Sequence, residues 1–492
     1  MSFVIGLDIG TTSTAGVLLR LPNEVVEIVS LPVDLESPYP GWAEQDPLQW
    51  WSNTCGICSS LLATSGIEPR EVIGIGVAGM LPALVLLDDK GSLLRHSIQQ
   101  SDARCGAEVE NLLEEIDEDD FLARTGNGVN QQLAIGKLRW LKNHEPDVFA
   151  KIAVVFGSYN YINWLLTGQK AVDANWALES GFVDVAQRRV ADDLVALARI
   201  PRSALPRMVE SHEVLGCISA AAEKSTGLLA GTPVMGGAAD FIASALCAGL
   251  QRKGDVLIKF GGSIDVLTVS DRPVGHESLY LDYHLIPGLF VPNGCMSSGG
   301  TGLNWLANNF LFARPDTLEP IDHHQLDQLA DGIAAGSEGV IVLPYFLGEK
   351  TPLHHPDARG VISGLSFSHG PGHLWRAFLE AYAYEIRHHI EVFNAAGHAT
   401  ERFTVSDGGS SSAVWMQIVS DVIQRPLQTL TGHPGSCLGA AWTAAVGKAG
   451  YSWSQSSSLT GLGAIVKPDP TKSAAYEEGY QSFRELHRRI HD

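Results

Sequence analysis

An acid, a glycine and several hydroxyl side chains follow one another in Asp8-Ile9-Gly10-Thr11-Thr12-Ser13, directly after an apolar run. Glycine permits a tight turn in which successive backbone N–H groups point at one anion, and the hydroxyls of Thr11 and Thr12 add neutral donors. Asp8 ends the apolar run, where its carboxylate could hold a hydrated divalent cation. The segment predicts a strand, a phosphate-binding turn at Gly10, Thr11 and Thr12, and a second strand. An ordinary hairpin turn would have a similar composition.

A second segment of this kind lies half a chain later. The strand-like run Val256-Leu257-Ile258-Lys259-Phe260 leads into Gly261-Gly262-Ser263, and a second strand-like run, 266–269, follows. Two strand–turn–strand units at this separation predict two related halves. Facing each other across a cleft, the two turns would hold the phosphates of a nucleotide from both sides.

Asp240 is the candidate for proton transfer. It follows the run Pro233-Val234-Met235-Gly236-Gly237-Ala238-Ala239 and precedes an apolar helical pattern. An acid at the start of a helix can simply stabilise that helix. In a cleft beside a transferring phosphoryl group, the same carboxylate would act as a general base toward an attacking hydroxyl.

A third glycine turn occurs in residues 403–412, where a strand-like run meets Gly408-Gly409 and a helical pattern follows. The backbone of such a turn can lie flat against a planar ring or a phosphate. The Walker pattern G-x-x-x-x-G-K-[ST] does not occur in the sequence, which argues against a P-loop nucleotide site.

The composition of the chain limits its partners. It has 492 residues, 34 Lys and Arg against 55 Asp and Glu, and a net charge of −21, which argues against nucleic-acid binding. The sequence lacks a basic signal-peptide start, and its longest apolar stretch, 72–87, is too short and too rich in glycine to span a membrane. Seven cysteines are few for a secreted protein, so we expect a cytoplasmic one. Cys55 and Cys58 have C-x-x-C spacing, and we interpret them as structural, with a redox or metal role as the alternative.

Strand-like runs alternate with helical patterns along the whole chain, which is typical of α/β proteins. Helical spacing of apolar residues occurs in 50–62, 105–116, 241–250, 372–393 and 412–424. The polar segment 251–255 would join two domains, residues 1–250 and 251–492.

Several motifs, in a fixed order, resemble the FGGY family of carbohydrate kinases. The similar segments are Asp8 to Ser13, Gly41-Trp42-Ala43-Glu44-Gln45-Asp46-Pro47, Ser101-Asp102-Ala103-Arg104, Lys137-Leu138-Arg139-Trp140, Gly348-Glu349-Lys350-Thr351-Pro352, Asp357-Ala358-Arg359-Gly360 and Gly408-Gly409. The resemblance covers nearly the whole chain. It implies the two-domain, ribonuclease H-like fold of sugar kinases, actin and Hsp70, with an interdomain cleft.

The resemblance also implies the chemistry and the residues that perform it. ATP with Mg²⁺ would phosphorylate a hydroxyl of a small sugar or polyol, Asp240 would be the general base and Asp8 would lie at the metal. The implied nucleotide and phosphate contacts are Gly10, Thr11, Thr12, Gly261, Gly262, Ser263, Gly300, Asn304, Gly408 and Gly409. The implied sugar contacts are Leu81, Pro82, Gln100, Asp240 and Phe241. Sugar and ATP would be the partners, without nucleic acid or membrane, and a homodimer is an open possibility.

The sequence differs from the family pattern in two places. Gly262 stands where relatives usually have threonine, which removes one phosphate-contacting hydroxyl. The layout is closest to the xylulokinase branch, but Pro82 and Gln100 replace the histidine and tryptophan that this branch carries at the sugar. A lost hydroxyl partner commonly changes the accepted substrate. Ribulose, gluconate, tetritols and glycerol therefore stay open as substrates. A nucleotide-switched actin-like binding protein and a kinase fold without catalysis are further alternatives.

Overall fold

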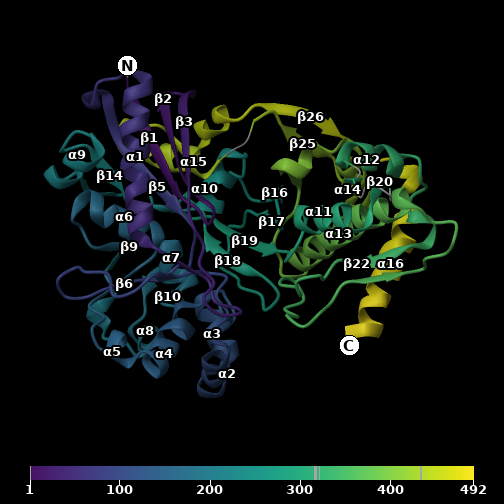
Figure 1. The fold of residues 1–492 in the computed structure, drawn as a ribbon, viewed down its shortest axis with the longest axis horizontal. Coiled ribbons are helices and arrows are strands. Elements are labelled where there is room, and N and C mark those ends of the chain that lie inside the picture. Colours follow the sequence, from purple (N-terminus) through teal and green to yellow (C-terminus); the bar gives the residue numbers. More distant parts are fainter. Residues whose placement is uncertain (1, 315–318, 321, 433–434, 492) are drawn as a thin grey trace.

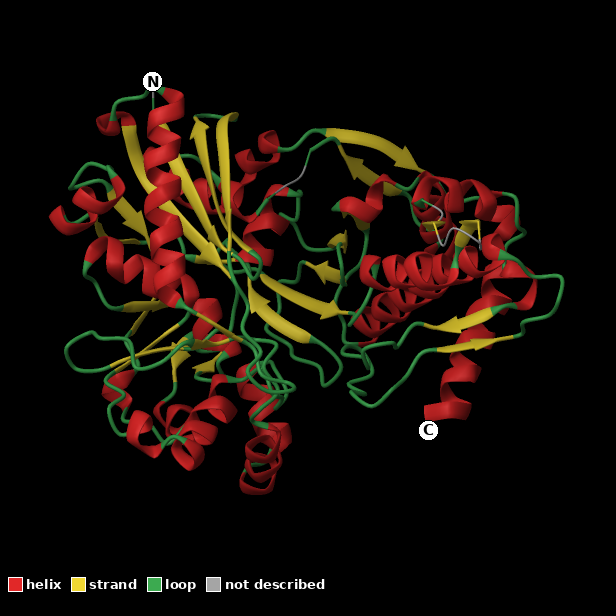
Figure 2. Ribbon diagram, viewed as in Figure 1, coloured by secondary structure: helices red, strands yellow, loops and turns green. Residues whose placement is uncertain are grey.

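The computed structural model describes residues 2–314, 319–320, 322–432 and 435–491. Its strands form two large mixed sheets, one in each half of the molecule, as Figure 1 and Figure 2 show. Helices pack on both sheets. The α/β class that the sequence predicts is confirmed.

The first sheet has the strand order β13-β14-β5-β1-β2-β3. Its strands are β1 (Phe3–Ile9), β2 (Ser13–Arg20), β3 (Glu24–Pro32), β5 (Val72–Gly79), β13 (Val214–Cys217), β14 (Pro233–Met235) and β15 (Ala238–Ala239), which pairs with β5. β1 runs antiparallel to β2 and parallel to β5. Its nearly continuous apolar sequence suits a central strand that is buried on both faces.

The second sheet repeats this arrangement in the order β18-β19-β17-β16-β24-β25-β26. Its strands are β16 (Asp255–Phe260), β17 (Ile264–Thr268), β18 (Tyr280–Tyr283), β19 (Phe290–Cys295), β24 (Arg402–Ser406), β25 (Leu427–Leu430) and β26 (Leu462–Val466). β16 runs antiparallel to β17 and parallel to β24, as β1 does to β2 and β5. Both predicted strand–turn–strand units are therefore central hairpins of related sheets.

Sixteen helices are present in the described residues. They are α1 (Pro47–Ser65), α2 (Gly106–Glu115), α3 (Glu118–Thr125), α4 (Ala134–His144), α5 (Pro146–Phe149), α6 (Ser158–Thr167), α7 (Ala174–Glu179), α8 (Asp192–Leu197), α9 (Ala220–Thr226), α10 (Asp240–Cys247), α11 (Gly300–Phe310), α12 (His323–Asp331), α13 (Pro371–Ala395), α14 (Ala413–Ile423), α15 (Ser436–Ala449) and α16 (Ser473–His491). Each predicted helical segment falls on one of them. In α1, the Asp46 side chain caps the first turn and Gly66 ends the helix in the left-handed region.

Short two-stranded ladders complete the structure. They pair β4 (Glu44–Gln45) with β7 (Ser97–Ile98), β6 (Val85–Leu87) with β8 (Val154–Phe156), β9 (Ala171–Asp173) with β12 (Arg207–Val209), β10 (Val183–Asp184) with β11 (Arg189–Val190), β20 (Phe312–Arg314) with β21 (Glu319–Pro320), and β22 (Ile341–Leu343) with β23 (Val361–Ser363). In the described part of the chain, no helix has the length and apolar character needed to cross a bilayer.

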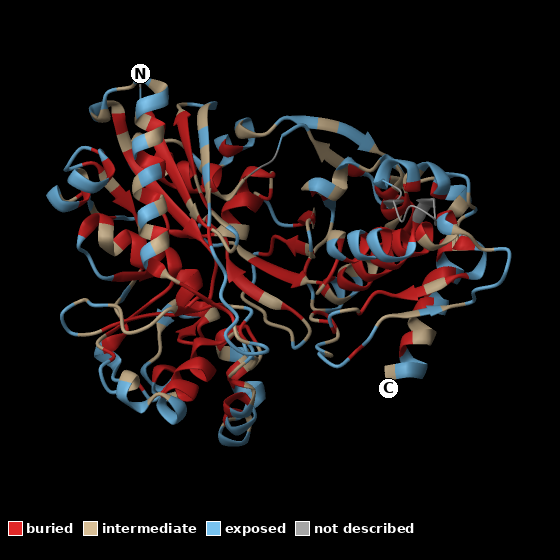
Figure 3. Cartoon of the chain, viewed as in Figure 1, coloured by how far each residue is buried: buried red, intermediate tan, exposed pale blue. Residues whose placement is uncertain are grey.

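The central strands of both sheets lie in apolar cores. Figure 3, in which buried residues are red, shows these strands as largely buried. Helix α15 belongs to the core of the first sheet, although β25 and β26, which flank it in the sequence, lie in the second sheet. Figure 1 shows α15 beside β1 and α10. The contact is close because glycines form it: a Cβ at Gly6 would overlap the Cys437 carbonyl oxygen, and one at Gly439 would overlap that of Ala243. The division of the chain at residue 250 stays a prediction.

Candidate active site

The end of strand β1 and the starts of helices α10 and α15 meet, and they bring Asp8, Asp240 and Ser436 together. Asp8 is near the end of β1, Asp240 is the first residue of α10 and Ser436 is the first residue of α15. Burial and the charge of Asp240 raise the pKa of Asp8 to about 7, against the effects of a hydrogen bond to Ser436 and of the Lys259 charge. Two carboxyls that repel each other in this way are suited to a shared cation.

Asp240 lies on a cavity of about 260 Å³ and is held by its own helix start. The Phe241 backbone N–H donates to Asp240 Oδ1 over 2.6 Å. Burial raises the pKa of Asp240, while the Lys259 ammonium and the Phe241 N–H lower it. The carboxylate therefore faces a cavity with an accepting oxygen, as a general base must.

Both halves of the chain line this smaller cavity. The first half contributes Met80, Leu81, Gln100, Gln132, Glu179, Asp240 and Phe241. The second half contributes Lys259, Ser263, Asp265, Leu267, Tyr280, Asn293, Cys295, Lys350 and Ser436. Of the predicted sugar contacts, Leu81, Gln100, Asp240 and Phe241 line the cavity, whereas Pro82 is buried and does not appear in its lining.

One face of the second sheet forms a wall of this cavity. Asp265 of β17 lies opposite Cys295 of β19, and Asn293 lies opposite both Leu267 and Tyr280. These residues share a face because side chains alternate along a strand. The motif analysis missed them, although residues 265 and 267, and 293 and 295, have the two-residue spacing of one strand face.

A buried carboxyl pair, of which Glu179 lines the cavity, joins the two halves. Burial raises the pKa of Glu179, in α7, well above its usual range, so its protonated carboxyl hydrogen-bonds Asp282 of β18. Burial also raises the pKa of Asp282 to about 7, and the Asn293 amide donates to its Oδ2 over 3.0 Å. A proton shared between the two carboxyls reduces the repulsion between them.

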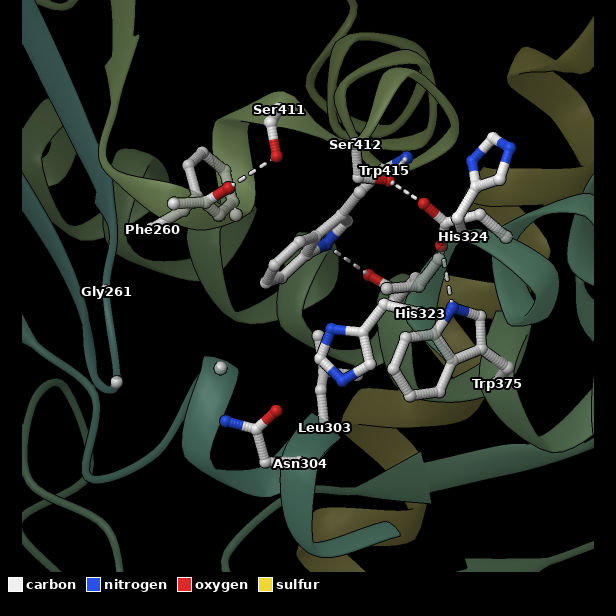
Figure 4. A pocket seen from close by; sticks show the side chains of 16 residues that line it. Phe260, Gly261, Leu303, Asn304, His323, His324, Trp375, Ser411, Ser412 and Trp415 are labelled. Carbon is white, nitrogen blue, oxygen red and sulfur yellow. Dashed lines mark hydrogen bonds between the residues drawn. The ribbon is translucent and has the colours of Figure 1, made fainter. Parts of the chain in front are cut away.

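A larger cavity of about 610 Å³ lies on the second half alone (Figure 4). It is lined by Phe260, Gly261, Gly262, Gly300, Leu303, Asn304, His323, His324, Asp327, Trp375, Leu379, Gly408, Gly409, Ser411, Ser412 and Trp415. The six nucleotide contacts predicted at Gly261, Gly262, Gly300, Asn304, Gly408 and Gly409 thus come together. The aromatic and acidic members near α12 and α13 were not predicted.

Backbone hydrogen bonds tie the second hairpin turn to the start of α11. The Gly300 N–H donates to the Gly261 carbonyl and the Thr301 N–H donates to the Gly262 carbonyl, each over 3.0 Å. A Cβ at Gly300 would lie 2.8 Å from the Gly261 oxygen, so only glycine permits this approach. The turn therefore lies beside a helix N-terminus, which is a favourable place for phosphate.

Asp327 organises the opposite wall of the larger cavity. Its two oxygens accept from Trp375 Nε1 over 2.7 Å and from Ser412 Oγ over 2.6 Å, as the dashed lines in Figure 4 show. Gly409 is required beside it, because a Cβ there would lie 2.7 Å from Trp415 Cζ3 and 2.8 Å from Phe260 Cβ. Flat aromatic and backbone surfaces of this kind suit a planar base.

The first turn, Gly10 to Ser13, lines neither cavity in the described residues. The Gly10 N–H donates to the Ser13 carbonyl over 3.0 Å, which closes the turn. Gln45 Nε2 donates to the Thr11 carbonyl over 2.6 Å and Trp50 Nε1 donates to Gln45 Oε1 over 3.2 Å. The roles of Gly10, Thr11, Thr12 and the metal role of Asp8 stay predictions.

Three of the predicted motifs meet in a buried network. The Arg104 guanidinium makes two hydrogen bonds to Asp102, of 2.8 and 2.7 Å, and a third contact of 2.6 Å to Glu44. It also lies 3.6 Å from the ring centre of Trp42, and Lys137 Nζ donates to the Gln99 carbonyl over 2.7 Å. These residues support the loop that carries Gln100 and do not line the cavity themselves.

The motif at Glu349 supports the strand wall from the other side. Ser297 N–H donates to Glu349 Oε1 over 2.8 Å, and the Cys295 N–H donates to Thr351 Oγ1 over 2.6 Å. Burial and the charge of Glu385 raise the pKa of Glu349 to about 8. The motif thus fixes the end of β19 and brings Lys350 to the cavity.

Comparison with known proteins decides the family. The model of the FGGY family of carbohydrate kinases, N-terminal domain, matches residues 3–247, and that of its C-terminal domain matches residues 256–447. The chain belongs to the FGGY family of carbohydrate kinases. It is therefore an ATP-dependent sugar kinase with the two-domain fold shared by sugar kinases and actin-like ATPases.

Similar proteins span nearly the whole chain. The crystal structure of xylulose kinase from Rhodospirillum rubrum is 53% identical, with a TM-score of 0.94 over 99% of each chain. Xylulose kinase of Klebsiella pneumoniae is 31% identical over 440 residues, which cover 89% of this chain and 88% of that protein. Gluconokinase of Bacillus subtilis is 26% identical over 449 residues, which cover 89% and 86%.

Proposed function

We propose that this FGGY kinase transfers the γ-phosphoryl group of ATP to a hydroxyl of a ketopentose, with xylulose as the first candidate. The main observation that supports this reaction is that the β16–β17 hairpin borders both cavities. Gly261 and Gly262 line the larger cavity, and Lys259 and Ser263 line the smaller one. A nucleotide in the larger cavity would present its phosphates to a sugar in the smaller one. The names of the similar kinases support xylulose.

Asp240 is the general base of the proposed reaction. It accepts the proton of the attacking sugar hydroxyl while the sugar oxygen bonds to the γ-phosphorus. The bond from that phosphorus to the β,γ-bridging oxygen breaks, and ADP leaves. The start of α10 and the Phe241 N–H keep the Asp240 carboxylate oriented and help it to remain ionised before the reaction.

Mg²⁺ is part of this proposal, and the residues at the end of β1 fit it. Asp8 Oδ1 is buried and has no hydrogen-bond partner among the described residues, and a carboxylate oxygen is a preferred ligand of Mg²⁺. Asp8 would hold the ion together with ATP phosphates and water, which leaves Asp240 free to accept the proton. When bound, it neutralises phosphate charge; Mg²⁺ commonly needs only one or two protein carboxylates.

A panel of acceptors tests the proposed function. Purified protein with MgATP is assayed for ADP release with xylulose, ribulose, gluconate, glycerol and erythritol, and the sugar product is identified by mass. Xylulose should give the highest kcat/KM. If another acceptor exceeds it by tenfold or more, the ketopentose assignment is wrong; if none stimulates turnover while ATP binds, sugar phosphorylation itself is wrong.

A sugar acid is the second candidate, and Lys350 is the observation that favours it. Lys350 lines the sugar cavity, and its ammonium has no hydrogen bond or ion pair with any residue that the structure describes. A substrate carboxylate would supply that partner. In the same panel, this candidate requires gluconate to be the best acceptor and Lys350→Met to raise its KM more than that of xylulose.

A further inference from the structure

Lys259 carries a positive charge to the junction between the two cavities. Along β16, Ile258 and Phe260 point into the core of the second half, whereas Leu257 and Lys259 point the opposite way, toward the first half. Lys259 is two residues before Gly261, so its side chain leaves the strand beside the predicted phosphate turn. It lines the smaller cavity together with Asp240.

Four carboxyls surround this lysine from several elements. Asp265 is its cross-strand partner in β17, Asp407 follows the neighbouring strand β24, and Asp240 and Asp8 come from the first half. Burial lowers the pKa of Lys259, but the four acids outweigh burial and raise it overall. The side chain is therefore an ammonium ion at neutral pH.

The ammonium group has no direct partner of its own. None of the hydrogen bonds or ion pairs between described residues involves Lys259 Nζ, although the side chain is largely enclosed. An enclosed charge without a hydrogen-bonded counter-ion is costly, and a ligand that supplies anionic oxygens removes that cost. The Lys259 ammonium is therefore suited to bind an anion in the cavity.

Other sources of positive charge are few at this place. Among the described residues that line the two cavities, only Lys259 and Lys350 are lysine or arginine. The predicted phosphate turns offer backbone N–H groups and hydroxyls, and Gly262 adds no side-chain donor. Charge on a transferring phosphoryl group must still be stabilised.

We infer that the Lys259 ammonium binds the γ-phosphoryl group of ATP and stabilises the charge on it during transfer to the sugar. This inference rests on the proposed kinase reaction and adds a catalytic residue to it. The bonds formed and broken are those given above, and the proton still goes to Asp240. Lys259 donates hydrogen bonds to γ-phosphoryl oxygens and keeps its own protons.

The experiment compares three variants. Lys259→Met removes the charge and nearly keeps the volume, and Lys259→Arg keeps the charge. Lys253→Met is the matched control, because Lys253 is an exposed lysine that pairs with Asp271 at the surface. Affinities for ADP and for the non-hydrolysable ATP analogue with an imido bridge are measured by calorimetry with Mg²⁺, and kcat is measured with the best acceptor.

Lys259→Met should lower kcat by about 10²–10³-fold, the usual effect of removing one preorganised donor from a transition state. It should weaken the imido analogue at least tenfold and leave ADP within threefold, because only the analogue carries a γ-phosphate. Lys259→Arg should restore at least part of the analogue's affinity, and Lys253→Met should match the wild type.

Equal losses of ADP and analogue affinity, or a Met variant with kcat within threefold of the wild type, would overturn the inference. If Lys259→Met does not fold, Lys259→Arg and Lys259→Gln decide by the same two affinities. The affinities do not depend on the acceptor. A protein that phosphorylates no sugar but still loses analogue affinity specifically in Lys259→Met therefore rejects the proposed function and keeps the phosphate contact.

Discussion

The pKa of the Asp240 carboxyl is raised by some of its surroundings and lowered by others. Burial raises its pKa and so makes the carboxylate a stronger base, whereas the Lys259 charge and the Phe241 N–H oppose this rise. Its place at the first residue of α10 fixes the carboxylate through the packing of that helix on α15.

Replacing Asp240 with asparagine tests this role at the scale of one residue. Asp240→Asn keeps the shape but cannot accept the hydroxyl proton, so kcat should fall by at least about 10²–10⁴-fold. ADP affinity should change less than threefold, because the larger cavity, where we propose that the nucleotide binds, does not include this residue. The measurements are steady-state kinetics and calorimetric titration with ADP, and an Asp240→Asn enzyme with normal kcat would contradict the assignment.

Single residues also show which members of the candidate site could be predicted from the sequence. Gly261 and Gly409 were found because small residues in turns are visible as patterns, whereas Gly300 came from the family resemblance. The structure brings all three to one cavity. Lys259 and Asn293 could not be found in this way. They are ordinary strand residues, and their role depends on which face of the second sheet meets the first half.

At the scale of elements, the loop that carries Gln100 depends on a network that does not line the cavity. Gln99 is held by Lys137 and Asp102 by Arg104, on either side of Gln100. The side chains of Arg104 and Asp102 are completely buried. The motifs found in the sequence therefore include supporting residues, which only the structure separates from contact residues.

Arg104→Leu should destabilise the protein by about 3–5 kcal/mol, because it leaves the buried Asp102 carboxylate without its partner. Denaturant unfolding measures this loss, and the KM for the sugar should rise in the fraction that folds. The matched control is Arg124→Leu, whose partly exposed pair with Asp193 should contribute at most about 1 kcal/mol. Equal losses in both variants would contradict the supporting role.

The contact between α10 and α15 is the second element to test. Gly439→Val places a side chain against the Ala243 carbonyl and should cost about 1–3 kcal/mol or more, because α15 is packed on β1 and β5 and cannot move away without disturbing that sheet. It should also lower kcat, since the same two helices position Asp240 and Ser436. Gly128→Ala is the control: no atom lies within 4 Å of its added Cβ, and its effect should stay within about 0.5 kcal/mol.

At the scale of the whole molecule, buried ionisable groups set the pH at which the fold is most stable. Burial raises the pKa of Asp8 and Asp282 to about 7 and of Glu349 to about 8, so the folded state holds their protons longer than the unfolded state. Their stabilising contribution is complete only below the unfolded pKa near 4; it falls progressively as pH rises and is gone above about pH 8. Burial lowers the pKa of His284 and His389 to about 4, so their contribution is lost as pH falls below 6.5.

The melting temperature of the nucleotide-free protein should therefore be highest near pH 6–7 and fall toward pH 8.5. Asp282→Asn should reduce the fall between pH 6.5 and 8.5, because one titrating group is removed. Asp271→Asn is the control, since the exposed Asp271 pairs with Lys253, which lowers its pKa, and it is ionised throughout this range. Calorimetric scans across pH measure both, and a melting temperature that rises toward pH 8.5 would contradict the argument.

The division into two related halves could be predicted because each half repeats a strand–turn–strand pattern. The place of α15 could not be, since its partners β1 and β5 are several hundred residues earlier. Apolar periodicity indicates that a helix has a buried face, but it does not say which sheet covers that face.

The packing of α15 on the first sheet also determines when that sheet can be completed during synthesis. β1 and β5 leave the ribosome early, but the helix that covers them, Ser436–Ala449, is among the last segments translated. Until then, an apolar face of the nascent sheet has no permanent cover, and chaperones that recognise exposed apolar strands have a binding surface there. A fragment that stops at residue 250 should keep this surface permanently and aggregate.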